Sequence, residues 1–158
     1  MEVYRFYSRY NDDFIIYKEK LPVLKAKRKK GWFFNTNVKI FTIDDEKLIL
    51  EYDYFEFLVV KVKIVFQDLP VQITVKRKNL FSYSLRVDDV EIFNRFSNNF
   101  FSKKFGKTYL NKNEVASISR KVLSLHNEFE LKLESFTQYE MYCIIMLLID
   151  LTAIEIQG

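Results

Sequence analysis

The residues with the clearest chemistry are basic and lie close together in the first quarter of the chain. They are Lys25, Lys27, Arg28, Lys29 and Lys30, and the aromatic residues Trp32, Phe33 and Phe34 follow them. A cluster of this kind can bind anionic lipid, with each cation worth about 1 kcal/mol near a membrane surface. The sequence therefore predicts a lipid site on this run, with aromatic side chains that could dip into the membrane interface. The alternative is a solvated strand edge, on which lysine blocks aggregation.

Two further basic clusters could join this site if the fold brought them beside it. They are Lys76, Arg77 and Lys78, and then Lys103, Lys104 and Lys107. The net charge of +4 and the pI near 9.0 favour acidic partners such as anionic lipid or phosphoinositide, although solubility alone explains such a charge. Nucleic acid is the least favoured partner, because strand alternation places most aromatic residues inward and no RNP-type or zinc-finger motif appears.

No stretch carries a recognisable catalytic constellation. His126 is the only histidine, which disfavours a His/Cys metal site, and no nucleophile-elbow motif supports a Ser–His–Asp triad. Cys143 lies in an apolar segment and is typical of a buried, inert thiol. Asp150 is expected to be buried and paired with a lysine or with backbone amides, with a proton or ion site as the alternative. We therefore expect a non-enzymatic protein without cofactor or metal.

The strongest structural element is a predicted helix over residues 137–154. Thr137 and Glu140 form a capping box, and the same motif occurs in a register two residues earlier. Every residue from 141 to 149 is apolar, so the helix has no polar face and belongs in a protein core or a membrane. A span needs about 20 consecutive apolar residues. The uncharged run between Glu140 and Asp150 is less than half of that length, which favours a buried central helix and no transmembrane span.

The rest of the chain is predicted to be short strands. We expect strands over residues 3–7, 14–17, 23–29, 38–43, 48–66, 71–77, 83–87, 90–93, 108–110, 114–120 and 128–134. The segment 48–66 carries apolar residues at nearly every even position and should form two strands, with a turn or bulge near residues 53–56. Asp88 and Asp89 should form a tight hairpin, and residues 94–107 are expected to be a long loop or a short helix.

So many strands would curl or close rather than remain an open sheet. A helix with its side chains is about 10–12 Å across, and a barrel of about twelve strands is wide enough to hold one. The predicted fold is therefore mainly β: a roughly twelve-stranded closed antiparallel barrel that encloses a C-terminal hydrophobic α-helix. Residues 1–158 are expected to form a single domain.

Three segments suggest a family. LIDLTAIE at 148–155 resembles the LIDFxxFE-like end of phospholipid scramblases, and EVASISRK at 114–121 resembles a segment shared by scramblases and LURP-one-related proteins. FTIDDEKLIL at 41–50 is similar to their strand–acidic turn–strand repeat. The chain thus resembles the tubby C-terminal-like superfamily, well near its C-terminus and by pattern elsewhere. The resemblance implies a twelve-stranded barrel around a hydrophobic helix and, from tubby proteins, phosphoinositide binding through basic residues on the barrel.

The chain departs from scramblases in their functional segments. Residues 126–130 lack the alternating aspartates of a calcium loop, and the cysteine-rich and proline-rich segments are absent, so calcium-triggered scrambling is not expected. One cysteine and no apolar signal-peptide region favour a cytoplasmic protein, and Glu2 after the initiator excludes myristoylation. Peripheral association with a membrane is expected through the basic run. Two functions are carried forward: a module that binds anionic membrane lipid or phosphoinositide, and, alternatively, a protein-interaction or scaffold domain.

Overall fold

The structure is a computed structural model that describes residues 1–8, 13–57, 59–78, 82–97, 104–121, 128–134 and 138–157. The strands are β1 Glu2–Ser8, β2 Phe14–Lys18, β3 Leu21–Lys30, β4 Asn35–Thr42, β5 Leu48–Phe57, β6 Val59–Gln67, β7 Ile73–Arg77, β8 Tyr83–Val87, β9 Val90–Phe96, β10 Lys104–Leu110, β11 Asn113–Arg120 and β12 Glu128–Leu133. The helix α1 spans Glu140–Gln157.

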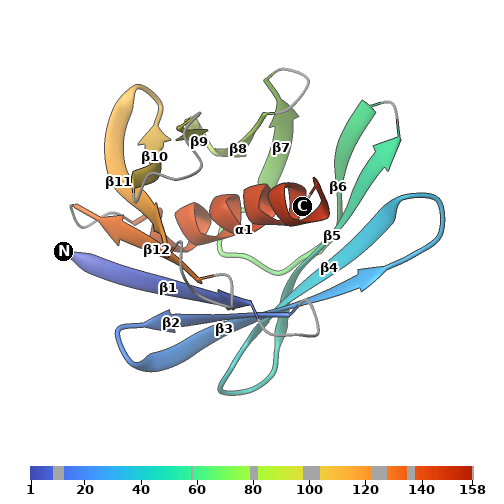
Figure 1. The fold of residues 1–158 in the computed structure, drawn as a ribbon, viewed down its shortest axis with the longest axis horizontal. Helices are drawn as coiled ribbons and strands as arrows, with labels where there is room; N and C mark the ends of the chain where they lie inside the picture. Colours follow the sequence, from blue (N-terminus) through green and yellow to red (C-terminus); the bar gives the residue numbers. More distant parts are fainter. Residues whose placement is uncertain are drawn as a thin grey trace.

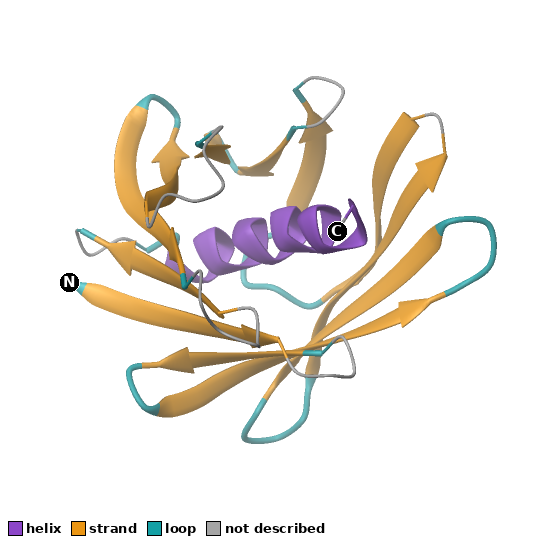
Figure 2. Cartoon of the chain, viewed as in Figure 1, coloured by secondary structure: helices purple, strands orange, loops and turns teal. Residues whose placement is uncertain are grey.

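All of these strands belong to one antiparallel sheet that curls into a nearly closed barrel around α1 (Figure 1). The sheet has 12 strands in the order β6-β5-β4-β3-β2-β1-β12-β11-β10-β9-β8-β7. The pairing of β1 with β12 joins the N-terminal strands of the sheet to the C-terminal ones. The helix lies along the interior, and strands surround it in the view coloured by secondary structure (Figure 2). The predicted mainly β barrel with a C-terminal helix is confirmed.

The helix is buried because none of its sides is polar enough to face water. Every residue from Tyr142 to Ile149 is buried, as is Leu151. Strand residues at alternate positions, such as Phe6, Ile16 and Leu50, supply the surrounding wall. No helix within the described residues combines the length and the apolar character needed to cross a membrane.

The start of the helix differs from the prediction. It begins at Glu140, and the predicted capping residue Thr137 lies outside the described residues. The Glu140 carboxylate accepts a hydrogen bond from the Tyr4 hydroxyl of β1 and lies 3.7 Å from the Lys18 ammonium of β2. Burial and this carboxylate raise the pKa of Tyr4 well above its usual value. The contact ties the first turn of the helix to the N-terminal strands.

The barrel has one seam, because β6 and β7 are the two ends of the sheet. The Gln67 side chain bridges it: its Oε1 accepts from the Ile73 N–H at 2.7 Å, and its Nε2 donates to the Ile73 carbonyl at 3.2 Å. The Tyr142 hydroxyl accepts from the Val71 N–H at 2.9 Å and donates to the Val71 carbonyl at 3.1 Å. At this end of the seam, the backbone groups of Val71 and Ile73 therefore bond to side chains in place of a neighbouring strand.

Three strand boundaries were wrong in the prediction. Strand β9 continues to Phe96 and β10 begins at Lys104, so residues 94–96 and 104–107 are strand rather than loop or short helix. The apolar alternation fails there because the inward positions hold the polar residues Asn94 and Thr108, both of which are buried. Strand β5 also continues to Phe57, beyond the turn expected near residues 53–56.

Candidate functional site

Strand alternation splits the basic run of β3 between two faces of the sheet. Lys25, Lys27 and Lys29 share the parity that faces outward, whereas Arg28 and Lys30 share the parity of the buried residues Leu24 and Ala26. The Arg28 guanidinium lies 4.9 Å from the centre of the buried Phe14 ring. The five basic residues therefore do not form one patch, because successive side chains of a strand point in opposite directions.

Neighbouring strands supply other lysines to the outward face. Lys27 of β3 lies directly opposite Lys39 of β4, and on the far side of β5 the cross-strand partner of Asp53 is Lys63 of β6. We call the outward lysines of β3, β4 and β6 the lysine face; it consists of Lys25, Lys27, Lys29, Lys39, Lys61 and Lys63. Among the described outward positions of β3, β4, β5 and β6, the acidic residues are Glu51 and Asp53 of β5.

The lysine face carries an excess of positive charge, because its six lysines are accompanied by two carboxylates, Glu51 in register with Lys39 and Asp53 in register with Lys63. None of its lysines forms an ion pair within the described part of the chain, and Lys27 contacts an aromatic ring instead, with Nζ 5.4 Å from the centre of Phe41. Like charges directly opposite each other destabilise a sheet. The Lys27–Lys39 pair therefore weakens the fold slightly and concentrates positive potential on this side of the barrel.

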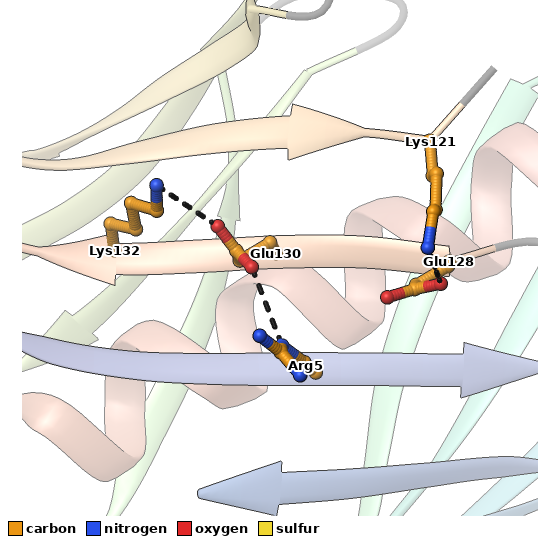
Figure 3. A network of polar contacts seen from close by, with 5 residues as sticks. All are labelled: Arg5, Lys121, Glu128, Glu130 and Lys132. Atoms are coloured by element: carbon orange, nitrogen blue, oxygen red, sulfur yellow. Dashed lines mark hydrogen bonds and ion pairs between the residues drawn. The ribbon is translucent and has the colours of Figure 1, made fainter. Parts of the chain in front are cut away.

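The outer face of β12 shows the contrasting arrangement, in which charges are balanced locally. Glu130 lies 3.4 Å from Arg5 and 3.2 Å from Lys132, and Glu128 lies 3.5 Å from Lys121 (Figure 3). Glu128 and Glu130 occupy alternate positions of β12 that face away from the core. Because each carboxylate has a basic neighbour, the positive potential of the molecule is concentrated elsewhere.

A shallow pocket of about 330 Å³ adjoins the lysine face on the outside of β2, β3 and β4. Its lining combines two lysines with apolar side chains and consists of Ile15, Tyr17, Pro22, Lys25, Lys27, Phe41, Thr42, Ile43 and Glu46. Such a lining can accept a group that is anionic at one end and apolar at the other.

The turn between β3 and β4 is apolar and fully presented to solvent. Trp32, Phe33 and Phe34 are 88%, 82% and 67% exposed, and Phe57 at the end of β5 is 54% exposed. The rings of Phe34 and Phe57 stack with centres 5.7 Å apart and an interplanar angle of 21°. We call these four residues the aromatic tip. The sequence singled out Trp32 and its two neighbours but not Phe57, which only the pairing of β4 with β5 brings beside them.

The second predicted cluster lies apart from the lysine face. Lys76, Arg77 and Lys78 are on or next to β7, and the sheet places β4, β5 and β6 between β3 and the seam that β7 borders. Lys78 pairs with Glu91 at 2.9 Å and lowers the pKa of that carboxyl, and its Nζ lies 3.3 Å from the centre of the Phe93 ring. These residues line a separate hollow of about 460 Å³ together with Ser84, Arg86 and Glu91.

The third cluster is only partly described. Lys103 and the side chain of Lys104 lie outside the described residues, and Lys107 forms an ion pair with Glu114 at 2.8 Å. The structure therefore brings neither Lys76–Lys78 nor Lys107 to the strand that carries the first basic run.

Asp150 is paired, but not with the lysine or backbone amides that the sequence suggested. Its Oδ2 accepts a hydrogen bond of 2.7 Å from Asn94 Nδ2, and Asn94 Oδ1 accepts one of 2.6 Å from the Thr108 hydroxyl. Burial raises the pKa of Asp150 to about 7, and the hydrogen bond from Asn94 opposes that shift. The carboxyl is thus poised to change protonation near neutral pH.

The remaining chemistry-bearing residues form no site within the described residues. Cys143 is fully buried, and burial raises the pKa of its thiol to about 12, as expected of an inert cysteine. His126 lies outside the described residues. No group of His, Cys, Asp and Glu side chains in the described ranges is arranged to hold a metal ion.

Three comparisons bear on the identity of the chain. Neither protein-family models, nor curated proteins, nor solved structures give a match. The resemblance to the tubby C-terminal-like superfamily therefore stays a prediction that depends on the sequence segments that suggested it.

Proposed function

We propose that this protein binds the surface of membranes that contain anionic lipid, and that the lysine face makes the contact. The observation that carries the proposal is the placement of Lys27 directly opposite Lys39, on a face where no lysine forms an ion pair within the described residues. Such a pair costs stability in the isolated protein, and a bound anion would turn that cost into binding energy. Phosphatidylserine and phosphoinositides both supply the negative charge.

The geometry suits a flat partner. The lysines come from strands that are adjacent in the sheet, so their ammonium groups spread over one side of the barrel instead of converging in a deep cleft. Long lysine side chains can extend toward a charged surface while their stems cover apolar neighbours such as Phe41. Peripheral association with the anionic cytoplasmic leaflet is part of this proposal.

The test is sedimentation of the protein with vesicles of phosphatidylcholine alone, or with added phosphatidylserine or phosphoinositide. We expect binding only to the anionic vesicles, and weaker binding as salt rises from about 0.1 M to about 1 M, because the Debye length shortens from about 10 Å to about 3 Å. A preference for phosphoinositide over phosphatidylserine at equal charge would identify the headgroup. Failure to bind any anionic vesicle at low salt would refute the proposal.

A matched pair of variants locates the contact. Lys27→Gln, Lys39→Gln and Lys63→Gln together should weaken vesicle binding at least tenfold, since each lysine near an anionic surface is worth about 1 kcal/mol. Lys107→Gln, Lys112→Gln and Lys132→Gln remove the same charge from β10, the β10–β11 turn and β12, on the other side of the barrel. If the two triple variants bind equally, the lysine face is not the contact.

A further inference from the structure

We infer that the aromatic tip is a membrane-insertion device: Trp32, Phe33, Phe34 and Phe57 enter the boundary between headgroups and acyl chains of an anionic bilayer. This inference rests on the proposed function, because the lysine face brings the protein to the surface that the tip then enters. It adds a second contact of different chemistry, which depends on apolar burial and therefore resists salt.

The backbone of the turn is the first argument. Phe33 and Phe34 have φ of 57° and 60°, and the Asn35 N–H donates to the Trp32 carbonyl at 3.4 Å, as in a type I′ turn with the two phenylalanines at its centre. The residues that adopt this conformation readily are Asn and Gly, because a bulky side chain clashes with its own backbone there. Two adjacent phenylalanines in the left-handed region therefore destabilise the hairpin turn. Residues in such strained conformations cluster at binding sites.

Exposure is the second argument. The aromatic tip contributes nothing to the barrel interior, since all four side chains are more than half exposed. The residues are nevertheless held together: the Glu56 N–H donates to the Phe34 carbonyl at 3.1 Å, and the Phe34 ring stacks on Phe57. Folding therefore gains little from these rings, yet the turn presents them as one preformed apolar group of the kind that marks an interaction site.

Charge around the tip selects the partner. Lys29 and Lys30 precede the turn on β3, and Lys61 lies in register with Phe55, two residues from Phe57. None of these lysines forms an ion pair within the described residues. An apolar tip ringed by free cations complements a bilayer, in which apolar chains lie beneath anionic headgroups.

The aromatic tip lies at one end of the barrel, from which it can enter a bilayer. The β3–β4 turn projects from the end of the barrel to which the C-terminal end of α1 points, and the end of β5 lies on the same side (Figure 1). The apolar face of an amphipathic helix at a membrane interface is buried about 5–10 Å into the boundary between headgroups and acyl chains, and an apolar turn needs a similar depth. The turn can reach that depth while the strands remain outside, because the aromatic residues occupy the extremity of the hairpin.

Trp32 provides a direct measurement because it is the only tryptophan in the chain. Its emission should be that of a solvated indole in buffer and should shift to shorter wavelength with vesicles of phosphatidylcholine and phosphatidylserine. Lipids that carry a quencher near the top of the acyl chain should quench it more strongly than lipids with a deep quencher. Sedimentation with the same vesicles, measured in parallel, reports binding independently of insertion.

A variant separates the function of the turn from its stability. Phe33→Asn with Phe34→Gly gives the residues that the backbone prefers, so the melting temperature should stay equal or rise by a few degrees. Vesicle affinity should nevertheless fall at least tenfold, and the Trp32 shift should shrink. The control is Leu21→Asn, which removes another exposed apolar side chain at the opposite end of β3 and should leave both readouts unchanged.

Three outcomes would decide against the inference. Vesicle binding with an unshifted Trp32 spectrum would refute insertion, leave the proposed function intact and point to a protein partner for the tip. Equal binding by the wild type and the Phe33→Asn, Phe34→Gly variant would do the same. Absence of binding to any anionic vesicle would overturn the proposed function and the insertion together.

Discussion

Asn94 of β9 donates a hydrogen bond of 2.7 Å to the carboxyl group of Asp150 on α1, and so links the barrel wall to the last turns of the helix inside it. The Thr108 hydroxyl of β10 donates to the same asparagine and fixes its orientation. Tyr52 and Tyr54 are close enough to Asp150 to interact with its charge, and burial keeps both phenols neutral by raising their pKa values. The polar contacts in this part of the core therefore centre on one titratable carboxyl.

This arrangement predicts that stability falls as pH rises from 5 to 8. The pKa of Asp150 is about 7 in the folded protein and near 3.8 when the carboxyl is solvated. The folded state therefore holds the proton more firmly, and the stability from the neutral carboxyl is present at low pH and lost as pH rises through about 7. Asp150→Asn should remove this dependence and be roughly 2–4 kcal/mol more stable than the wild type at pH 8.

Urea unfolding at several pH values between 5 and 8 checks the prediction. The range avoids the carboxyls of Asp45 and Glu91, whose pKa values are lowered in the folded protein and which titrate at more acidic pH. Parallel pH profiles for the wild type and the variant would show that Asp150 is not the group responsible.

The central helix should tolerate little change on its buried positions. Leu147 is fully buried, so Leu147→Ala should lower the free energy of unfolding by about 2–5 kcal/mol, and Leu147→Lys should prevent folding by placing an unpaired charge in the core. Met141→Ala, on a partly exposed position of the same helix, is the control and should cost much less. Thermal melts measure both, and equal losses at the two positions would argue against a buried helix.

The sequence predicted the parts of this fold that depend on local pattern. Alternation over residues 48–66 and the apolar run after Glu140 gave the strand and helix assignments directly. Residues 94–96 and 104–107 were assigned incorrectly because inward positions there are polar, and a polar residue inside a strand breaks the alternation on which the prediction depends. The sequence does not reveal that the partner of Asn94 is Asp150 on the helix, or that Thr108 donates to Asn94.

The candidate site was harder to predict because it depends on register. The basic run was visible as a cluster in sequence, but alternation turns Arg28 inward, and Lys39 joins Lys27 only through the pairing of β3 with β4. The left-handed conformation of Phe33 and Phe34 was also hidden, since two phenylalanines do not signal a type I′ turn. A single sequence contains no local signal for either feature.

Gly106 should be required by packing rather than by its backbone angles. A Cβ at this position would lie 2.8 Å from the Arg95 carbonyl oxygen and 2.9 Å from Cδ1 of Phe96. The pairing of β10 with β11 is irregular at the same residue. Gly106→Ala should therefore destabilise the protein by about 1–3 kcal/mol. The matched control is Gly31→Ala, whose Cβ would make an ordinary 3.4 Å contact with the Asn35 carbonyl oxygen. Chemical denaturation gives the free energy of unfolding of both variants, and similar values would contradict the packing argument.

The last prediction concerns the seam between β6 and β7. Gln67→Met keeps the length of the side chain but removes both hydrogen bonds to Ile73, and should lower the free energy of unfolding by about 1–3 kcal/mol. The effect should be local, because the barrel lacks a strand ladder at this point. In the Gln67→Met variant, hydrogen exchange should speed up at the Ile73 amide and become faster there than at the amide of Val87, the cross-strand partner of Ile73 in β8. Gln72→Met, at an exposed neighbouring position, is the control and should leave both rates unchanged. If exchange at Ile73 were unaffected by the loss of Gln67, the seam would be held by the Tyr142–Val71 contact alone, and Tyr142→Phe would then be the variant that opens it.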